Sequence, residues 1–589
     1  MRHIVSIACT GHGASISYLG ADGTVRSSVL DRWAGTKNTL MFSADEDREI
    51  RNPTSDMDRG IRDLLVYGFG KFPRTMIFEE TVHPWLEWLV GDLGIRPADI
   101  DLLVTSDSHF AVHPLRLGRK LSRWFPRARI VRAIEHHQVH QRQAFWQSGF
   151  SEAAVLTLDT CGEELDRLGG KKLSGTISAM NSRGECTVLS EMTFPESSAG
   201  IIYDSANRHV GFRQGDEGKT MGLAPYGGPE FFDRVVDRLR LYDDGHFLFM
   251  SDQEFKDCMR DYVPERSPGD EMTERHMNVA YAAQAIMNLI VTNAFKAAHR
   301  LTCLPDLVFA GGIALNSVAN EIARKEAGTR RLYMATNPGD TGHALGLALF
   351  GAYELAGWTP TGRELPEYLG PPYTEAQVRD AMGDLPHIAP PDLAEVVARM
   401  IANGYIVARF DGGAEFGPRA LGNRSILCDA RWPDMQDYLN LRVKHREEFR
   451  PFAPTVLEEE APHWFELEDR SAYMLRVVPV RPEAKERVPA IVHVDGSARV
   501  QTLSQSENPG YRQIIEAFYK LTGVPLLLNT SFNLGGKPIV ETPADAVACF
   551  TETLIDGLIM GPYLLTKLPP EEYLREPRAP LAGVELPAL

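Results

Sequence analysis

Two histidines four residues apart are the clearest chemical signal in this sequence. His136 and His140 lie in the segment 135–140, and on a helix an i,i+4 pair projects from one face. Two imidazoles on one face can ligate a metal ion. The alternative is an ordinary helix with solvated or hydrogen-bonded histidines, and this segment alone does not choose between them. His137 points away from that face and receives no role.

Two aspartates could complete a metal site, because each follows a strand-like run. Asp159 comes directly after the apolar residues 154–158, and Asp340 stands in the segment 337–342. Two imidazoles with one or two carboxylates suit Fe(II), Mn(II) or Zn(II), and the absence of a nearby cysteine argues against a thiolate site. The sequence therefore predicts one divalent metal ion held by His136, His140, Asp159 and Asp340.

Three apolar strands run into turns of small or polar residues. Residues 4–8 lead into 10–15, residues 154–158 into 159–163, and residues 307–310 into a turn that starts at Gly311 and Gly312. Backbone amides at such turns can approach an anion, although a turn glycine alone is weak evidence. The repeated strand-and-turn units predict a duplicated fold with nucleotide or substrate between its halves. The segment 216–227 lacks the P-loop spacing and is either a surface loop or a binding loop.

Cations gather in the last third of the chain, among glycine, serine and asparagine. They are Arg419, Arg424, Lys444, His445, Arg446 and Arg450. Each alone is usually a solvated surface charge, but together they suit a compact polyanion such as a nucleoside triphosphate or an acyl phosphate. Asn529, Thr530, Ser531 and Asn533 follow a strand and offer neutral donors and acceptors, for which simple turn chemistry is the alternative.

The composition bounds the class of protein. The chain has 589 residues, of which 43% are hydrophobic and 24% charged, so disordered, collagen-like and disulfide-scaffold classes are excluded. Its 62 Lys and Arg against 79 Asp and Glu give a formal charge of −17, which disfavours nucleic-acid binding. Seven scattered cysteines and the lack of an export signal or membrane span predict a reduced, cytoplasmic setting.

The elements that must position these groups alternate between strand and helix, which predicts an α/β architecture. A proline-marked stretch at 370–391, around one short helical segment, is the expected linker between residues 1–369 and residues 392–589. Beyond it, residues 393–402 read as a helix, 405–410 and 524–528 as buried strands, and residues from 568 onward as an extended tail.

Several long motifs resemble one known family. The segments 217–227, 311–316, 415–425 and 529–533, together with the histidine pair, are similar to the NodU/CmcH family of O-carbamoyltransferases from about residue 4 to about residue 565. The resemblance implies a duplicated actin/sugar-kinase-like (ASKHA) domain over 1–369, which binds metal and transfers the carbamoyl group. It also implies a YrdC-like α/β domain over 392–589, which forms carbamoyl adenylate.

The resemblance further implies an activity and its cofactors. ATP and carbamoyl phosphate would give carbamoyl adenylate, and the carbamoyl group would pass to a hydroxyl of a small-molecule natural product, as in antibiotic biosynthesis. The implied cofactors are Mg²⁺ with ATP and a divalent metal in the first domain, with Fe²⁺ expected and Mn²⁺ or Zn²⁺ as alternatives. Neither nucleic acid nor membrane is an expected partner.

The family's site residues carry over position by position. His12 matches the catalytic histidine, which would act as the base, and the four predicted metal ligands match the family's ligands. Nucleotide contacts in the first domain map to Arg32, Lys37, Gly311, Gly312 and Asn316, and the ATP and carbamoyl phosphate contacts map to Arg419, Arg424, Lys444, Arg450, Asn529 and Ser531. Gly13 and Thr160 depart from the family pattern.

Two other functions remain as alternatives. A tRNA threonylcarbamoyl transferase-like enzyme needs a basic surface, which the charge of −17 disfavours. A non-catalytic nucleotide-binding regulator would tolerate loss of the metal histidines and of Arg419, yet both are present. The segments 38–74 and 197–214, which would line the acceptor pocket, carry no recognisable pattern, so the sequence does not identify the acceptor. It does not indicate an oligomeric state either.

Overall fold

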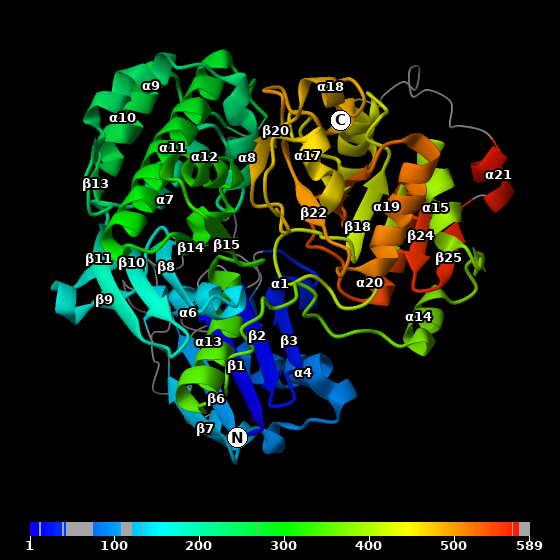
Figure 1. Cartoon of the computed structure of the whole chain (residues 1–589), viewed down its shortest axis with the longest axis horizontal. Helices are drawn as coiled ribbons and strands as arrows, with labels where there is room; N and C mark the ends of the chain where they lie inside the picture. Colours follow the sequence, from blue (N-terminus) through cyan, green and yellow to red (C-terminus); the bar gives the residue numbers. More distant parts are fainter. Residues whose placement is uncertain are drawn as a thin grey trace. The chain divides into compact units, whose positions relative to one another are not determined.

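The structure is a computed structural model that describes residues 1–10, 13–37, 40–42, 75–107, 121–132, 135–267, 269–567 and 569–575. The chain folds into two compact units, Met1–Gly370 and Pro371–Leu589 (Figure 1). His12 and the segment 43–74 lie outside the described residues.

Two sheets of the first unit share one plan. The first has the order β3(Val25–Val29), β2(Gly13–Gly20), β1(His3–Thr10), β6(Leu102–Asp107), β7(Arg129–Arg132), and the second has the order β11(Cys186–Phe194), β10(Lys171–Asn181), β8(Glu152–Leu158), β14(Asp306–Ala310), β15(Arg331–Met334). In each sheet the first three strands pair antiparallel and the last two continue in parallel. This repeated order confirms the predicted duplication and the α/β class.

Two helices lie between these sheets. α6 (His136–Ser148) packs on β8 and β14, α13 (His343–Phe350) packs on β1 and β2, and the two helices pack on each other (Figure 1). Every residue of α13 is buried, which suits a helix that is apolar on all sides. The predicted helix under the histidine pair is confirmed.

The first unit has further helices and short strands. They are α1(Leu30–Trp33), α4(Phe78–Val90), α7(Ala199–His209), α8(Glu217–Leu223), α9(Glu230–Val235), α10(Asp252–Tyr262), α11(Glu274–Thr302), α12(Ser317–Ala327) and the short strands β4(Leu40–Phe42), β5(Thr75–Ile77), β9(Glu164–Leu165), β12(Arg240–Leu241) and β13(Phe247–Leu248). The expectation of a loop at 216–227 is wrong, because most of that segment forms α8, which buries Thr220 and Leu223.

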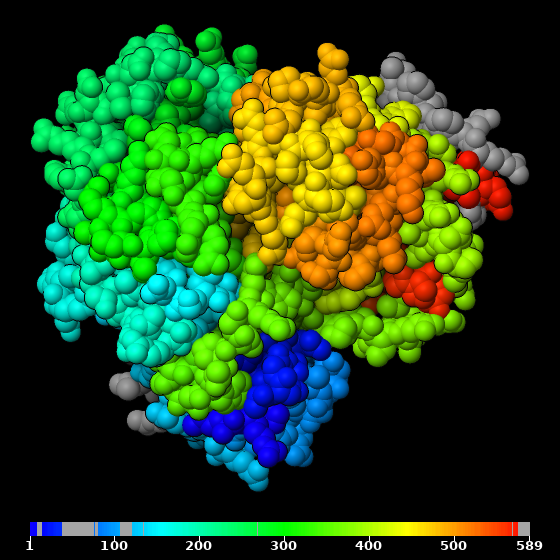
Figure 2. All heavy atoms as spheres, viewed as in Figure 1, coloured from blue at the N-terminus to red at the C-terminus, as the bar shows by residue number. Residues whose placement is uncertain are grey.

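The second unit is built on one eight-stranded sheet. Its order is β16(His387–Ile388), β25(Tyr563–Thr566), β24(Gly557–Met560), β17(Val407–Phe410), β18(Arg424–Cys428), β23(Leu526–Ser531), β19(Ala453–Leu457), β22(Gln501–Leu503). Further elements are α14(Glu375–Met382), α15(Leu393–Ala402), α16(Met435–Tyr438), α17(Ala461–Trp464), α18(Pro482–Lys485), α19(Pro509–Thr522), α20(Pro543–Glu552), α21(Pro570–Arg575), β20(Val477–Pro479) and β21(Ser497–Arg499). On the face drawn in Figure 2, the yellow and orange segments that carry α17, α18 and α19 form most of this unit's surface.

Three sequence expectations differ from the structure of this unit. The short helical segment expected within the linker at 370–391 is α14, but β16 pairs with β25, so residues after 370 belong to the second unit instead of forming a separate linker. The strand expected at 524–528 continues to Ser531, so Asn529 and Ser531 stand within β23 instead of in a turn. Residues 570–575 form α21, whereas an extended tail was expected. The helix expected at 393–402 is α15.

Among the helices of the described part of the chain, none is both long and apolar enough to cross a membrane.

Candidate functional site

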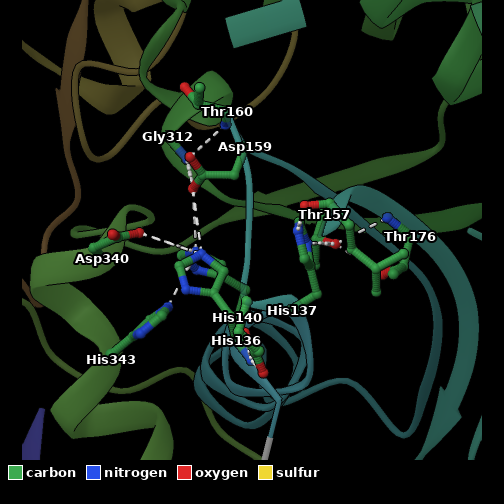
Figure 3. Close-up of polar contacts among 12 residues, drawn as sticks. His136, His137, His140, Thr157, Asp159, Thr160, Thr176, Gly312, Asp340 and His343 are labelled. Carbon is green, nitrogen blue, oxygen red and sulfur yellow. Dashed lines mark hydrogen bonds and ion pairs between the residues drawn. The ribbon is translucent and has the colours of Figure 1, made fainter. Parts of the chain in front are cut away.

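The first turn of α6 presents two histidine rings to two carboxylates (Figure 3). His136 starts the helix, where its backbone N–H donates to the Glu163 carboxylate at 2.9 Å. His136 Nε2 lies 3.5 Å from Asp340 Oδ1 and 3.9 Å from Asp159 Oδ2, and the corresponding distances from His140 Nε2 are 3.4 and 3.3 Å. The structure therefore brings all four predicted metal ligands together.

A glycine turn holds Asp159 in this position. Gly312 N–H donates to Asp159 Oδ2 at 2.8 Å, and Thr160 N–H donates to Asp159 Oδ1 at 2.6 Å. Gly311 has φ +95°, and a Cβ there would overlap the Leu158 carbonyl oxygen, so the turn requires glycine. Thr160, the departure from the family pattern, fits because it packs against Gly200, where a Cβ would overlap it.

A third imidazole, which the sequence analysis does not single out, joins the four side chains. His343 is the first residue of α13, and its Nε2 lies 3.1 Å from His140 Nε2. The spacing of Asp340 and His343 in one helical turn is the signal that could have found it. We call His136, His140, His343, Asp159 and Asp340 the histidine–aspartate cluster.

Burial separates the imidazoles from the carboxylates of this cluster. The side chains of His136 and His140 are 1% and 0% exposed, whereas those of Asp159 and Asp340 are 14% and 16% exposed. Burial alone would lower the pKa of His140, but hydrogen bonds and charges from Asp159 and Asp340 outweigh it and raise that pKa to about 9. The carboxylates thus stabilise positive charge between themselves and His140, and they leave the cluster open on their own side.

The donor set fits a divalent metal. Ligand atoms about 2.1 Å from one ion are roughly 3.0–3.4 Å apart at tetrahedral or right angles, and several pairs in the cluster have this spacing. His137 does not belong to the set, because its ring contacts Thr157 Oγ1 at 2.8 Å and the Leu173 carbonyl oxygen at 3.2 Å. Burial lowers the pKa of His137 to about 3, so that it stays neutral as a structural residue.

The residues predicted as nucleotide contacts of the first unit differ in burial and in their hydrogen bonds. Arg32 is buried in α1, and Lys37 is exposed. Asn316 is the N-cap of α12: its Oδ1 accepts the Ala319 N–H at 3.0 Å and its Nδ2 donates to Gln284 Oε1 at 3.1 Å. Gly311 and Gly312 form the Asp159 turn. The predicted base His12 lies outside the described residues.

Four arginines crowd together in the second unit. Burial and the charge of Arg450 lower the pKa of both Arg419 and Arg446, to about 10 and about 9. Arg499 in β21 is the most strongly affected, because burial and repulsion from the other three arginines hold its pKa well below the usual range. We call Arg419, Arg446, Arg450 and Arg499 the arginine cluster. Arg499 was missed in the sequence because it stands alone in a short strand.

The described surroundings neutralise these charges only in part. Glu447 lies 3.7 Å from Arg450 Nη1, and Arg446 donates to Asn440 Oδ1 at 2.7 Å. Among the described residues, Nε of Arg419 and Nε of Arg499 have no hydrogen-bond partner although both atoms are buried. A cluster of this kind suits an anion with several oxygens.

The other predicted anion contacts of the second unit fall into two groups. Lys444 Nζ donates to the Ser531 carbonyl and to Asn533 Oδ1, so Lys444 and Ser531 lie together. Arg424 is fully buried and donates to the carbonyls of Asp411 and Gly412, and Asn529 Nδ2 donates to Thr455 Oγ1. Arg424 and Asn529 therefore support the fold of the second unit, and their contacts with ATP or carbamoyl phosphate stay a prediction.

Comparison with known proteins covers both units. The chain matches the family models "Carbamoyltransferase N-terminus" over residues 115–349 and "Carbamoyltransferase C-terminus" over residues 398–567. It is 36% identical over 480 residues to uncharacterized protein sll1178 of Synechocystis sp., covering 74% of this chain and 76% of that protein. It is 37% identical over 447 residues to nodulation protein NolO of Bradyrhizobium diazoefficiens, covering 74% and 79%. A remote likeness to the crystal structure of T. kodakarensis HypF has a TM-score of 0.32 at 13% identity, covering 62% of this chain and 49% of that one.

Proposed function

This chain belongs to the carbamoyltransferase family, and from this premise we propose that it is an ATP-dependent O-carbamoyltransferase that modifies a hydroxyl of a small-molecule natural product. The observation that carries the proposal is that each unit has its own charged site. The N-terminal family model spans the histidine–aspartate cluster, and the C-terminal model spans the arginine cluster. One site suits a cation and the other suits a polyanion.

The arginine cluster supports an activation step in the second unit, which we propose to be YrdC-like. Carbamoyl phosphate and ATP both carry several anionic oxygens, which guanidinium groups bind with paired hydrogen bonds. One carbamoyl phosphate, one ATP and one water balance one carbamoyl adenylate, one phosphate and one pyrophosphate. In this step Arg419, Arg450 and Arg499 hold the phosphates, and Lys444 with Ser531 forms the neighbouring polar contacts.

The histidine–aspartate cluster supports a transfer step in the first unit. A divalent metal held there by His136, His140, Asp159 and Asp340, with Fe²⁺ expected and Mn²⁺ or Zn²⁺ as alternatives, would supply Lewis acidity toward the carbamoyl carbonyl or the adenylate phosphate. Gly312 and Glu163 fix the orientation of the ligands by the hydrogen bonds described above. His12 accepts the proton of the acceptor hydroxyl, because an alcohol is a weak nucleophile until its proton is removed.

The two steps can be separated by experiment. The His12→Ala variant is expected to keep pyrophosphate release that depends on ATP and carbamoyl phosphate, and to lose carbamoylation of a hydroxylated acceptor. The acceptor is found by screening hydroxylated metabolites with the wild-type protein for the mass gain of one carbamoyl group. Equal loss of both activities in a folded, metal-loaded His12→Ala protein would contradict the division into two steps.

A further inference from the structure

We infer that His343 is itself a ligand of the metal ion. The inference rests on its contact with His140 and on the other polar atoms that approach the same nitrogen of His140. The inference rests on the proposed metal site but goes beyond its four predicted ligands. It assigns the first residue of α13 to the ion, giving a centre of three imidazoles and two carboxylates.

The contacts of His140 Nε2 carry the argument. Three polar atoms approach this one nitrogen: Asp159 Oδ2 at 3.3 Å, Asp340 Oδ1 at 3.4 Å and His343 Nε2 at 3.1 Å. A ring nitrogen has one hydrogen or one lone pair, so it cannot make a good hydrogen bond to all three atoms. Donor atoms that surround a shared ion have this spacing, because each of them points at the ion and not at its neighbour.

His343 is placed as a ligand must be. Its side chain is fully buried, its Nε2 faces the cluster, and its Nδ1 has no hydrogen-bond partner among the described residues. Four ligand atoms, one each from His136, His140, Asp340 and His343, lie within 4.8 Å of one another.

The fold holds His343 against α6 through two glycines. A Cβ at Gly342 would overlap Gln143 and the Asn337 carbonyl oxygen, and a Cβ at Gly346 would lie 2.9 Å from the Val139 carbonyl oxygen. Gly346 therefore packs directly on α6. Gly342, just before α13, packs on α6 and on Asn337, which precedes it in the chain. This close approach brings the start of α13 to the face of α6 that carries His136 and His140.

A third imidazole changes which metals the site prefers. Imidazole nitrogen favours Fe, Ni, Zn and Cu, whereas a set of carboxylates alone suits Mg²⁺ or Ca²⁺. The cluster is therefore selective against the hard cations that accompany nucleotides. The exposed sides of Asp159 and Asp340 are where a substrate oxygen can reach the ion, because the imidazoles are buried.

The test uses Co²⁺ as the probe and the full-length protein. Metal-stripped wild type, His343→Ala and His343→Gln are titrated with Co²⁺, and the dissociation constant and visible absorption spectrum are measured. His209→Ala is the matched control, because His209 is also a buried imidazole but contacts the Val263 carbonyl oxygen at 3.0 Å in a different part of the unit. We expect at least a tenfold weaker Co²⁺ affinity and a changed spectrum in both His343 variants, and neither change in the control.

Unchanged affinity and spectrum in folded His343 variants would overturn the inference and leave the four-ligand site standing. Failure of wild type to bind Co²⁺ would instead contradict the metal site itself. If both His343 variants fail to fold, pulsed EPR of Cu²⁺-loaded wild type decides the question by counting coordinated imidazoles. Three support the role of His343, and two contradict it.

Discussion

The histidine–aspartate cluster and the arginine cluster differ in the sign of the ligand charge that would stabilise them. In the first unit two carboxylates face imidazoles, and they raise the pKa of His140 to about 9. In the second unit burial, together with the charge of Arg450, lowers the pKa of Arg446 to about 9. Carboxylates beside imidazoles suit an added cation in the first site, and guanidinium groups beside one another suit an added anion in the second.

The comparison teaches how an absent ligand can be recognised from the protein alone. A buried group whose charge is unfavourable in its surroundings costs free energy, and a protein keeps such a group where a ligand offsets the cost. Arg424 and Asn316 differ in degree, because Arg424 donates to backbone carbonyls and Asn316 caps α12. The predictions below test this distinction.

The largest effect is expected for loss of an imidazole in the histidine–aspartate cluster. His140→Ala removes the nitrogen on which both carboxylates converge, so bound metal should fall from one ion per chain to a small fraction. Loss of a partner outside the ligand set already weakens metal affinity about 10- to 100-fold, and loss of a ligand should exceed that. Elemental analysis after dialysis measures the effect, with His209→Ala as control. A stoichiometric metal content in His140→Ala would remove this cluster as the metal site.

The second effect is expected in the arginine cluster, where one substitution should weaken ligand binding and stabilise the ligand-free protein. Arg499→Met removes the guanidinium that the other three arginines repel. Pyrophosphate and ATP should then lose most of their stabilising effect on the second unit, while the ligand-free protein becomes more stable by about 1 kcal/mol, a shift of about 2–4 °C in its melting temperature. Thermal unfolding with and without pyrophosphate tests both halves. A destabilised ligand-free variant would indicate that Arg499 is a structural residue.

A smaller effect is expected where the charge is kept but its shape is lost. Arg419→Lys replaces a planar two-point donor by a single ammonium group. The KM for carbamoyl phosphate or ATP should rise about tenfold, since one charge-assisted hydrogen bond contributes about 1.5–3 kcal/mol. Steady-state pyrophosphate release gives the KM values. Kinetics equal to those of wild type would place Arg419 outside the ligand contacts.

The smallest effect distinguishes a cap from a nucleotide contact. Asn316→Ala removes the N-cap of α12 and should cost about 1 kcal/mol of stability, whereas Asn316→Asp keeps an oxygen that can accept the Ala319 N–H. Denaturant unfolding compares the two variants. A rise in KM for ATP in Asn316→Asp with unchanged stability would show that Asn316 contacts the nucleotide after all.

Local pattern in the sequence was sufficient for a large part of the fold. The i,i+4 spacing placed His136 and His140 on one face of α6, and the apolar runs predicted β1, β8 and β14. These features depend on side chains close together in the chain. The segment 370–391 was predicted less well, because β16 is held in the sheet by pairing with β25, which is distant in the chain.

The tertiary structure alone decided which distant residues share a site. His343 and His140 are separated by 203 residues and meet because two glycine-lined contacts hold α13 against α6. Arg499 and Arg424 also show that position in the sequence does not predict which residues share a site. The isolated Arg499 joins the arginine cluster, whereas Arg424, which stands in a family motif, donates to backbone carbonyls. The sequence determined the residue types and their local faces, and long-range packing determined which of them are left to bind a ligand, because a side chain's partners depend on contacts that spacing does not encode.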